Sequence, residues 1–208
     1  MSTSILRRYT DLPSLIYLLR KRRITMLDPR SWDDSNDSHY LALYKQKKAL
    51  SSVLALCFTQ ASETYHHWRV FANGSGGVSI SFDRDALLTA VEGRTGLRTG
   101  NVQYLKLTQI RDRRLKIREL PFLKRYAFEN ENEFRIVFED AARSLNHLDI
   151  PVPLSCIDRV TLSPWIARAL SNEVKAILRG IVGCAKLEIV RSTLIGNEEW
   201  KNLGESAK

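Results

Sequence analysis

The chain has 208 residues, of which 44% are hydrophobic and 26% charged, a balance typical of a folded domain with a sizeable core. Its 32 Lys and Arg residues outnumber its 23 Asp and Glu residues, which gives a formal net charge of +9. Such an excess favours anionic partners, such as nucleic acid or a phosphorylated ligand, and a merely soluble basic surface explains it equally well.

The chain contains three cysteines, Cys57, Cys156 and Cys184, each among apolar residues. An odd count without paired spacing predicts neither a disulfide framework nor a thiolate zinc site, so we expect reduced thiols in the core. The N-terminal residues lack an apolar signal segment, and no window approaches ~18 apolar residues. We therefore expect a cytoplasmic protein without membrane contact. The sequence does not predict its oligomeric state.

Apolar patterning predicts strands and helices that intermingle along the chain. Asp11 is expected to cap a helix that ends in the basic run 20–23, and Asp83 to cap a helix that follows an alternating strand. The predicted strands are 5–10, 24–27, 52–59, 78–82, 102–107, 134–139, 156–162 and 187–191. The predicted helices are 12–23, 39–50, 62–72, one after Asp83, 108–120 and 165–179. Because no regular strand–helix–strand rhythm appears, we predict an α+β fold in one domain over residues 1–208, with a mixed, mainly antiparallel sheet flanked by helices.

An acidic series leads into one predicted strand. Glu129, Glu131 and Glu133 occupy every second position before an apolar, β-rich run. In a strand these three side chains would share one face, where their charges repel unless a cation, a proton or a ligand relieves them. The series therefore indicates a site, and pairing with Arg125 or Arg135 on a solvated face is the structural alternative.

Basic residues cluster just before that series. On the predicted helix 108–120, Arg111, Arg114 and Arg118 would lie on one face and could follow the phosphates of a nucleic acid. Lys124 and Arg125 come directly before the acidic series and add to this predicted nucleic-acid contact. A solvated surface helix is the alternative.

Two further polar patches carry weaker signals. The loop from Asp28 to Asp37 holds several oxygen ligands suited to Mg²⁺ or Ca²⁺, but it lacks the glycine and closing glutamate of an EF-hand, and the same residues make turns and caps. We therefore expect no metal. In His66-His67-Trp68, the two histidines point about 100° apart on a helix, so only one, taken as His67, would contact a ligand.

The order of several motifs resembles the bacterial domain of unknown function family 2971. That family has a Tyr near its N-terminus, an Asn-Asp-Pro loop, a Cys-Phe-Ser strand, a Trp-x-x-Tyr-Ala helix and a Glu-x-Glu-x-Arg strand. The matching segments here are Arg8-Tyr9, Leu56-Cys57-Phe58-Thr59, His67-Trp68-Arg69-Val70-Phe71-Ala72 and Glu131-Asn132-Glu133-Phe134-Arg135. The chain departs from the pattern at Asp33-Asp34-Ser35, Thr59 and Phe71.

More distantly, an early strand with Arg, a middle strand with Ser and a late Glu-x-Glu strand resemble the ADP-ribosyltransferases. The resemblance implies that Arg8 holds the diphosphate or ribose of NAD. It also implies that Ser79 or Ser81 lines the nicotinamide pocket, with Tyr9 or Tyr65 as an aromatic partner.

The same resemblance assigns Glu133 as the catalytic carboxylate and Glu131 as the group that orients the acceptor. The implied function is that of an NAD-consuming bacterial effector that modifies nucleic acid or protein. Two alternatives stay open: a non-catalytic nucleic-acid-binding module of a defence or toxin–antitoxin system, and a metal-dependent nuclease that uses Glu133 with the loop 28–37.

Overall fold

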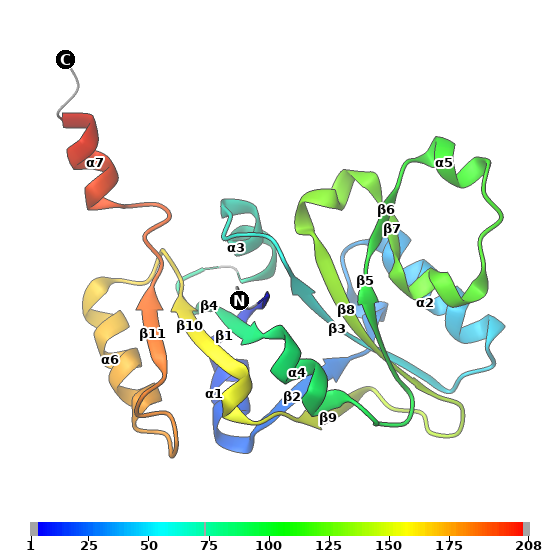
Figure 1. Cartoon of the computed structure of the whole chain (residues 1–208), viewed down its shortest axis with the longest axis horizontal. Helices are drawn as coiled ribbons and strands as arrows, with labels where there is room; N and C mark the ends of the chain where they lie inside the picture. The colour runs from blue at the N-terminus through cyan, green and yellow to red at the C-terminus, as the bar shows by residue number, and fades with distance from the viewer. Residues whose placement is uncertain (1–3, 73, 206–208) are drawn as a thin grey trace.

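A large mixed sheet organises the chain (Figure 1), as seen in the computed structural model, which describes residues 4–72 and 74–205. The strands are β1 Ile5–Asp11, β2 Arg23–Leu27, β3 Ser52–Thr59, β4 Gly77–Asp83, β5 Leu97–Asn101, β6 Gln103–Leu105, β7 Leu123–Arg125, β8 Glu133–Asp140, β9 His147–Pro151, β10 Ile157–Leu162 and β11 Glu188–Arg191. The α-helices are α1 Leu12–Lys21, α2 Ser35–Lys47, α3 Tyr65–Phe71, α4 Arg84–Val91, α5 Leu107–Arg111, α6 Arg168–Arg179 and α7 Glu198–Glu205. The 3-10 helices are η1 Pro29–Ser31, η2 Ile117–Phe122, η3 Tyr126–Glu131 and η4 Leu154–Cys156.

The main sheet runs in the order β11-β10-β4-β1-β3-β2-β9, and β8 lies between β3 and β5. Its neighbours pair antiparallel except for β10 and β11, so the predicted mixed, mainly antiparallel sheet with flanking helices is confirmed. A small parallel pair, β6 and β7, stands apart. No helix in the described part of the chain is both long and apolar enough to span a bilayer.

The sheet divides between β1 and β3. β1 pairs with β4 along its whole length, and β3 pairs with β8 along its whole length, but β1 and β3 meet at the single register Arg7↔Thr59. Continuous antiparallel strands would exchange hydrogen bonds along many residues. The two halves of the sheet therefore separate beyond Arg7, and the space between them becomes available to a ligand.

Successive side chains of a strand point to opposite faces of the sheet, so each face has its own hydrophobic core. Leu54 and Ile136 belong to the large apolar cluster formed with α1, α4 and α6. Their neighbours Val53 and Val137 point the other way and pack with α2. On that second face Tyr9 packs with Trp68 of α3, so α2 and α3 flank the division between β1 and β3.

Local signals gave most of these elements correctly. Asp11 and Asp83 do cap α1 and α4, accepting hydrogen bonds from the amides of Ser14 and Ala86. The predicted helix 108–120 is wrong: α5 ends at Arg111, and a separate 3-10 helix, η2, begins at Ile117, where the Glu119 carboxylate accepts from the Lys116 amide at 3.1 Å and from Arg113 at 3.0 Å.

Apart from the 3-10 helices, the remaining differences are earlier or later helix starts and four unpredicted elements. α2 begins at Ser35 because Asp34 caps it, whereas α3 and α6 begin later than expected, at Tyr65 and Arg168. The sequence analysis does not predict β5, β7, β9 or α7, because each is short and so carries little apolar periodicity.

Candidate functional site

A cavity of about 410 Å³ lies where β1 and β3 separate. Its size falls in the range of ligand-binding pockets, roughly 300–1,000 Å³. The Arg8 side chain spans the opening, because its Nη1 donates to the Cys57 carbonyl oxygen at 3.2 Å. Burial lowers the pKa of Arg8, yet a guanidinium stays protonated in proteins. The first wall of the cavity is therefore cationic.

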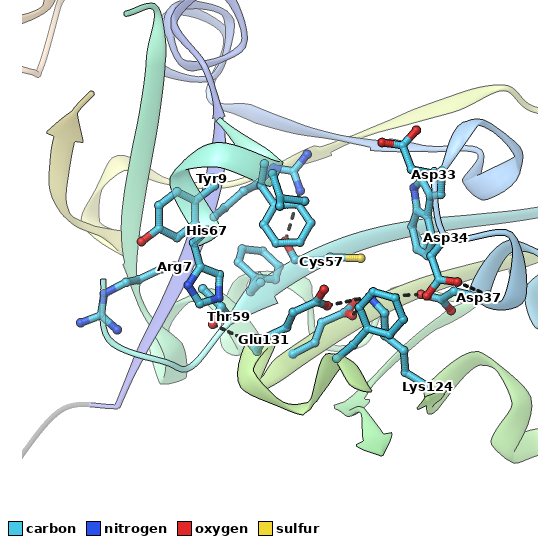
Figure 2. Close-up of a pocket in the computed structure, with 18 of the residues that line it drawn as sticks. Arg7, Tyr9, Asp33, Asp34, Asp37, Cys57, Thr59, His67, Lys124 and Glu131 are labelled. Atoms are coloured by element: carbon cyan, nitrogen blue, oxygen red, sulfur yellow. Dashed lines mark hydrogen bonds and ion pairs between the residues drawn. The ribbon is translucent and has the colours of Figure 1, made fainter. Parts of the chain in front are cut away.

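The opposite wall carries three buried carboxylates around Lys124, those of Asp37, Glu131 and Glu133, and Figure 2 labels Lys124 with Asp37 and Glu131. Lys124 Nζ lies 2.6 Å from Glu131 Oε2 and 3.5 Å from Glu133 Oε2. Burial raises the pKa of Glu131, and Lys124 only partly offsets this. Burial opposes the charge on Lys124 too, but Glu133 and Glu131 outweigh it and raise the lysine pKa. The lysine is thus held charged between them.

Arg135 holds Glu133 from behind. Its Nε donates to Glu133 Oε1 at 2.7 Å and its Nη2 to Glu133 Oε2 at 2.9 Å, a two-point contact. Burial alone would raise the pKa of Glu133, but Arg135 and then Lys124 bring it below the ordinary glutamate value. Glu133 and Glu131 therefore differ in protonation: Glu133 is ionised over a wider pH range, whereas Glu131 keeps its proton more readily.

Stacked rings form the aromatic part of the cationic wall. The Tyr9 and His67 rings lie 5.3 Å apart and 13° from parallel, and Trp68 meets Tyr9 edge-on. Burial raises the pKa of Tyr9 to about 12 and lowers that of His67, so both are neutral near pH 7. Thr64 Oγ1 contacts His67 Nδ1 at 2.6 Å. With that hydroxyl donating to Nδ1, Nε2 carries the hydrogen.

Two polar atoms of this wall lack partners. Within the described residues, the Tyr9 hydroxyl, which lies beside Ser79, and His67 Nε2 are both buried without a hydrogen bond of acceptable geometry. Buried polar atoms are normally satisfied, so an orphan beside a cavity indicates where a ligand or an ordered water binds.

The structure brings half of the predicted site residues together. The predicted residues that line the cavity are Arg8, Tyr9, His67, Lys124, Glu131 and Glu133. Ser79 and Ser81 do not belong to its lining; they are buried on β4, paired with Tyr9 and Arg7. Glu133 does pair with Arg135, as the structural alternative had it, but the pair is buried rather than on a solvated face.

Two predictions about the acidic and basic series are wrong. Glu129 and Glu131 lie in η3 rather than in a strand, and Asn132 has a left-handed φ of 42°, so only Glu133 begins β8. Arg111, Arg114 and Arg118 share no helical face, because α5 ends at Arg111. Arg125 is exposed, whereas Lys124 is buried among carboxylates and does not present its charge to a nucleic acid.

The sequence analysis missed several lining residues. Arg7, Thr59, Trp32 and Asp37 line the cavity, and Asp37, considered there as a metal ligand or a turn and cap residue, pairs with Arg135. Asp34 caps α2 and Asp28 pairs with Arg30. Within residues 4–72 and 74–205, no group of three His, Cys, Asp or Glu side chains is arranged to hold a metal ion. The two-residue spacing of Glu133 and Arg135 was the available signal, since it places both on one strand face.

Comparison with known proteins gives only distant likenesses. No protein-family model and no curated protein matches the sequence, so membership in family 2971 stays a prediction. Solved structures of Thermus sp. 2.9 DarT are similar: the complex with NAD+ shares 11% identity over 92% of this chain and 96% of that one, with a TM-score of 0.47. The complex with ADP-ribosylated ssDNA gives 10% identity over 92% and 95% of the two chains, also at 0.47. At such values the function must be argued from this chain's own residues.

Proposed function

We propose that the cavity binds NAD and that the protein breaks the nicotinamide–ribose bond to transfer ADP-ribose to a nucleophile on nucleic acid or protein. The observation that carries this proposal is the pair of facing walls. Arg8, Tyr9 and His67 face two carboxylates, Glu131 and Glu133, whose pKa values are displaced in opposite directions. Carboxylates that differ in this way are suited to two different roles in one reaction.

The ionised Glu133 would stabilise the positive charge that develops on the ribose. When the glycosidic bond breaks, its electron pair leaves with nicotinamide, and C1′ of the ribose becomes oxocarbenium-like. A fixed carboxylate nearby lowers the energy of that cation, and the pocket needs no reorganisation because Arg135 already orients Glu133.

Glu131 would serve the acceptor. Its raised pKa brings it closer to neutral pH, where a carboxylate accepts a proton more effectively. The nucleophile forms a bond to C1′ and gives its proton to Glu131, so the products are nicotinamide, ADP-ribosylated acceptor and one released proton. Lys124 pairs with both carboxylates and offsets their mutual repulsion.

The cationic wall would bind the rest of NAD. Arg8, and Arg7 at the division of the sheet, offer guanidinium groups for the diphosphate, and Tyr9 offers a ring face to a planar base. His67 Nε2 would donate to a ligand oxygen and so gain the partner it lacks. Ser79 and Ser81 would support Tyr9 and Arg7 from β4 rather than touch the ligand.

A nucleic acid is one acceptor class that the surface favours. Arg111, Arg114, Arg118 and Arg125 are exposed, and the chain carries a net charge of +9. The same surface supports the second candidate, a module that binds nucleic acid without catalysis. Binding that weakens steeply with salt and is insensitive to Glu133→Gln, without nicotinamide release, would favour that second candidate.

The test is calorimetric titration of NAD followed by measurement of free nicotinamide. We expect Glu133→Gln to reduce nicotinamide release by about 10²-fold or more, the usual loss on removing one electrostatic stabiliser. Glu139→Gln is the matched control, because Glu139 also lies on β8 and pairs with an arginine, Arg98 at 3.0 Å, but does not line the cavity. Absence of both NAD binding and nicotinamide release in the wild type would reject the proposal.

A further inference from the structure

The Arg135 side chain is the most fully satisfied polar group around the cavity. A guanidinium has five N–H donors. Arg135 uses Nε on Glu133, Nη1 on both Asp37 Oδ1 and the Pro121 carbonyl, and Nη2 on both Asp37 Oδ2 and Glu133, at distances between 2.7 and 2.9 Å. The side chain is fully buried and packs over the Trp32 ring at 5.1 Å. It therefore has no alternative position without losing hydrogen bonds.

Asp37 supplies the other end of this contact. It is the third residue of α2, near the positive end of the helix dipole, and its side chain is 1% exposed. Its two oxygens accept from both Nη atoms of Arg135 at 2.9 and 2.8 Å. A two-point contact fixes the plane of the guanidinium as well as its place, and Glu133 is held by the adjacent edge, which shares Nη2.

We infer that Asp37 and Arg135 are positioning residues: Asp37 fixes the Arg135 guanidinium, and the guanidinium keeps the Glu133 carboxylate ionised and in place at the cavity wall. This inference rests on the proposed function where it concerns turnover, and on the contacts alone where it concerns Glu133. The contact joins α2 to β8 across 98 residues of sequence.

The charged and titratable groups facing Glu133 determine what each substitution does. They are Arg135 on β8, Lys124 on β7, Cys57 on β3, Tyr104 on β6, Asp37 on α2 and Glu131 on η3. Removing the Arg135 charge leaves Lys124, 3.5 Å away, as the cation that remains close to Glu133 among the described residues. Removing the Asp37 charge takes away a negative group and leaves the cations in place.

The two positions therefore separate charge from geometry. In Arg135→Gln, the pKa of Glu133 should rise, because the arginine, the main group that offsets burial, is gone while Lys124 remains. In Asp37→Asn, the Glu133 pKa should not rise, but the guanidinium loses an acceptor and its fixed plane. Turnover in Asp37→Asn should fall by about 10²-fold, the effect of a small displacement at the reacting atoms, with NAD affinity unchanged.

The experiment combines carboxyl carbon NMR titration of Glu133 with nicotinamide release and NAD calorimetry in the full chain. Asp37→Glu restores the charge and should recover part of the turnover lost in Asp37→Asn, and Glu139→Gln is the control for an arginine–carboxylate pair elsewhere on β8. Chemical denaturation establishes that each variant is folded.

Three outcomes decide the matter. An unchanged Glu133 titration in folded Arg135→Gln overturns the inference. Full turnover in Asp37→Asn, or equal loss of turnover and NAD affinity, overturns the positioning role of Asp37. A wild type that neither binds nor cleaves NAD, together with a Glu133 titration that responds to Arg135→Gln, rejects the proposed function while supporting the contact inferred here.

Discussion

Lys124 and Arg135 place two positive charges among three buried carboxylates, those of Asp37, Glu131 and Glu133. Ionising all three leaves one uncompensated negative charge in a poorly solvated wall. Burial raises the pKa values of both Glu131 and Asp37, so the excess charge is shared between these two carboxyl groups. Asp37 pairs with Arg135 and Lys124, and Glu131 pairs with Lys124, so Glu131 carries part of the energetic cost of the site.

We predict that Glu131→Gln is more stable than the wild type at neutral pH. A raised pKa means that folded Glu131 binds its proton more tightly than unfolded Glu131, so the wild type loses stability as pH rises through the folded pKa. Gln mimics the protonated form and avoids that loss. Urea denaturation at pH 7 and near pH 4 measures the difference, which should vanish at the lower pH. Glu129→Gln, an exposed change in the same η3 helix, should alter neither value.

Lys124→Met should have the opposite effect. It leaves Glu131 with no cation in contact and removes one of two from Glu133, and uncompensated buried charge costs about 3–5 kcal/mol of unfolding free energy. The deficit should shrink at acid pH, where the carboxylates protonate. Urea denaturation measures it, with exposed Lys106→Met as control. If Lys124→Met and Lys106→Met are equally stable, the cavity wall holds the unpaired carboxylate charge without a loss of unfolding free energy.

At the scale of elements, α3 presents His67 to the cavity through its own N-cap. Thr64 Oγ1 accepts from the His67 amide at 3.2 Å and contacts His67 Nδ1 at 2.6 Å. The Thr64 hydroxyl therefore caps α3 and also orients the His67 ring. Loss of the cap and loss of ring orientation should consequently occur together.

We predict that Thr64→Val costs about 1 kcal/mol of stability, as removal of a helix cap usually does, and also weakens NAD binding. Asp83→Ala removes the cap of α4, which accepts from the Ala86 amide at 2.9 Å away from the cavity. That control should lose similar stability without losing affinity. Thermal unfolding and calorimetry check both expectations, and Thr64→Ser should behave like the wild type. If the Thr64→Val protein binds NAD normally, His67 does not contribute to NAD binding.

Elements with strong local signals were predictable, and the geometry of the cavity was not. Asp11 and Asp83 caps depend on residues three positions apart, so the sequence sufficed for α1 and α4. The single contact of β1 with β3 depends on long-range pairing that no local pattern encodes. The failed helix 108–120 shows the converse, since its charge pattern is helical, yet α5 and the separate 3-10 helix η2 take its place.

The candidate site was likewise predictable where its contacts are local in sequence, and not where they are long-range. The alternation of Glu133 and Arg135 predicted their pairing, because both lie on one strand face. Asp37 lies on α2, 98 residues before Arg135 in the sequence. The carboxylates hold the Lys124 side chain in the cavity wall rather than at the surface. The basic residues beside Lys124 in the sequence do not indicate this burial, because tertiary contacts determine whether a lysine is buried.

At the scale of the whole molecule, Glu63 joins the last strand of the sheet to the cavity. Its Oε1 accepts from Trp68 Nε1 at 2.6 Å and from Ser192 Oγ, just after β11. Trp68 in turn packs edge-on against Tyr9, with ring centroids 5.1 Å apart. The position of α3 over the division of the sheet therefore depends on a carboxylate that does not itself line the cavity.

We predict that Glu63→Ala weakens NAD binding several-fold although it touches no ligand. The change leaves the buried Trp68 N–H without its acceptor, a cost of about 1–3 kcal/mol, and frees α3 to move relative to β1. Glu188→Ala is the control, because Glu188 on β11 pairs with half-exposed Arg159 and such pairs contribute little. Calorimetry and urea denaturation measure the two quantities. Lower stability with unchanged NAD affinity would mean that Tyr9 and its packing fix α3 without Glu63, and that the C-terminal strand is not coupled to the cavity.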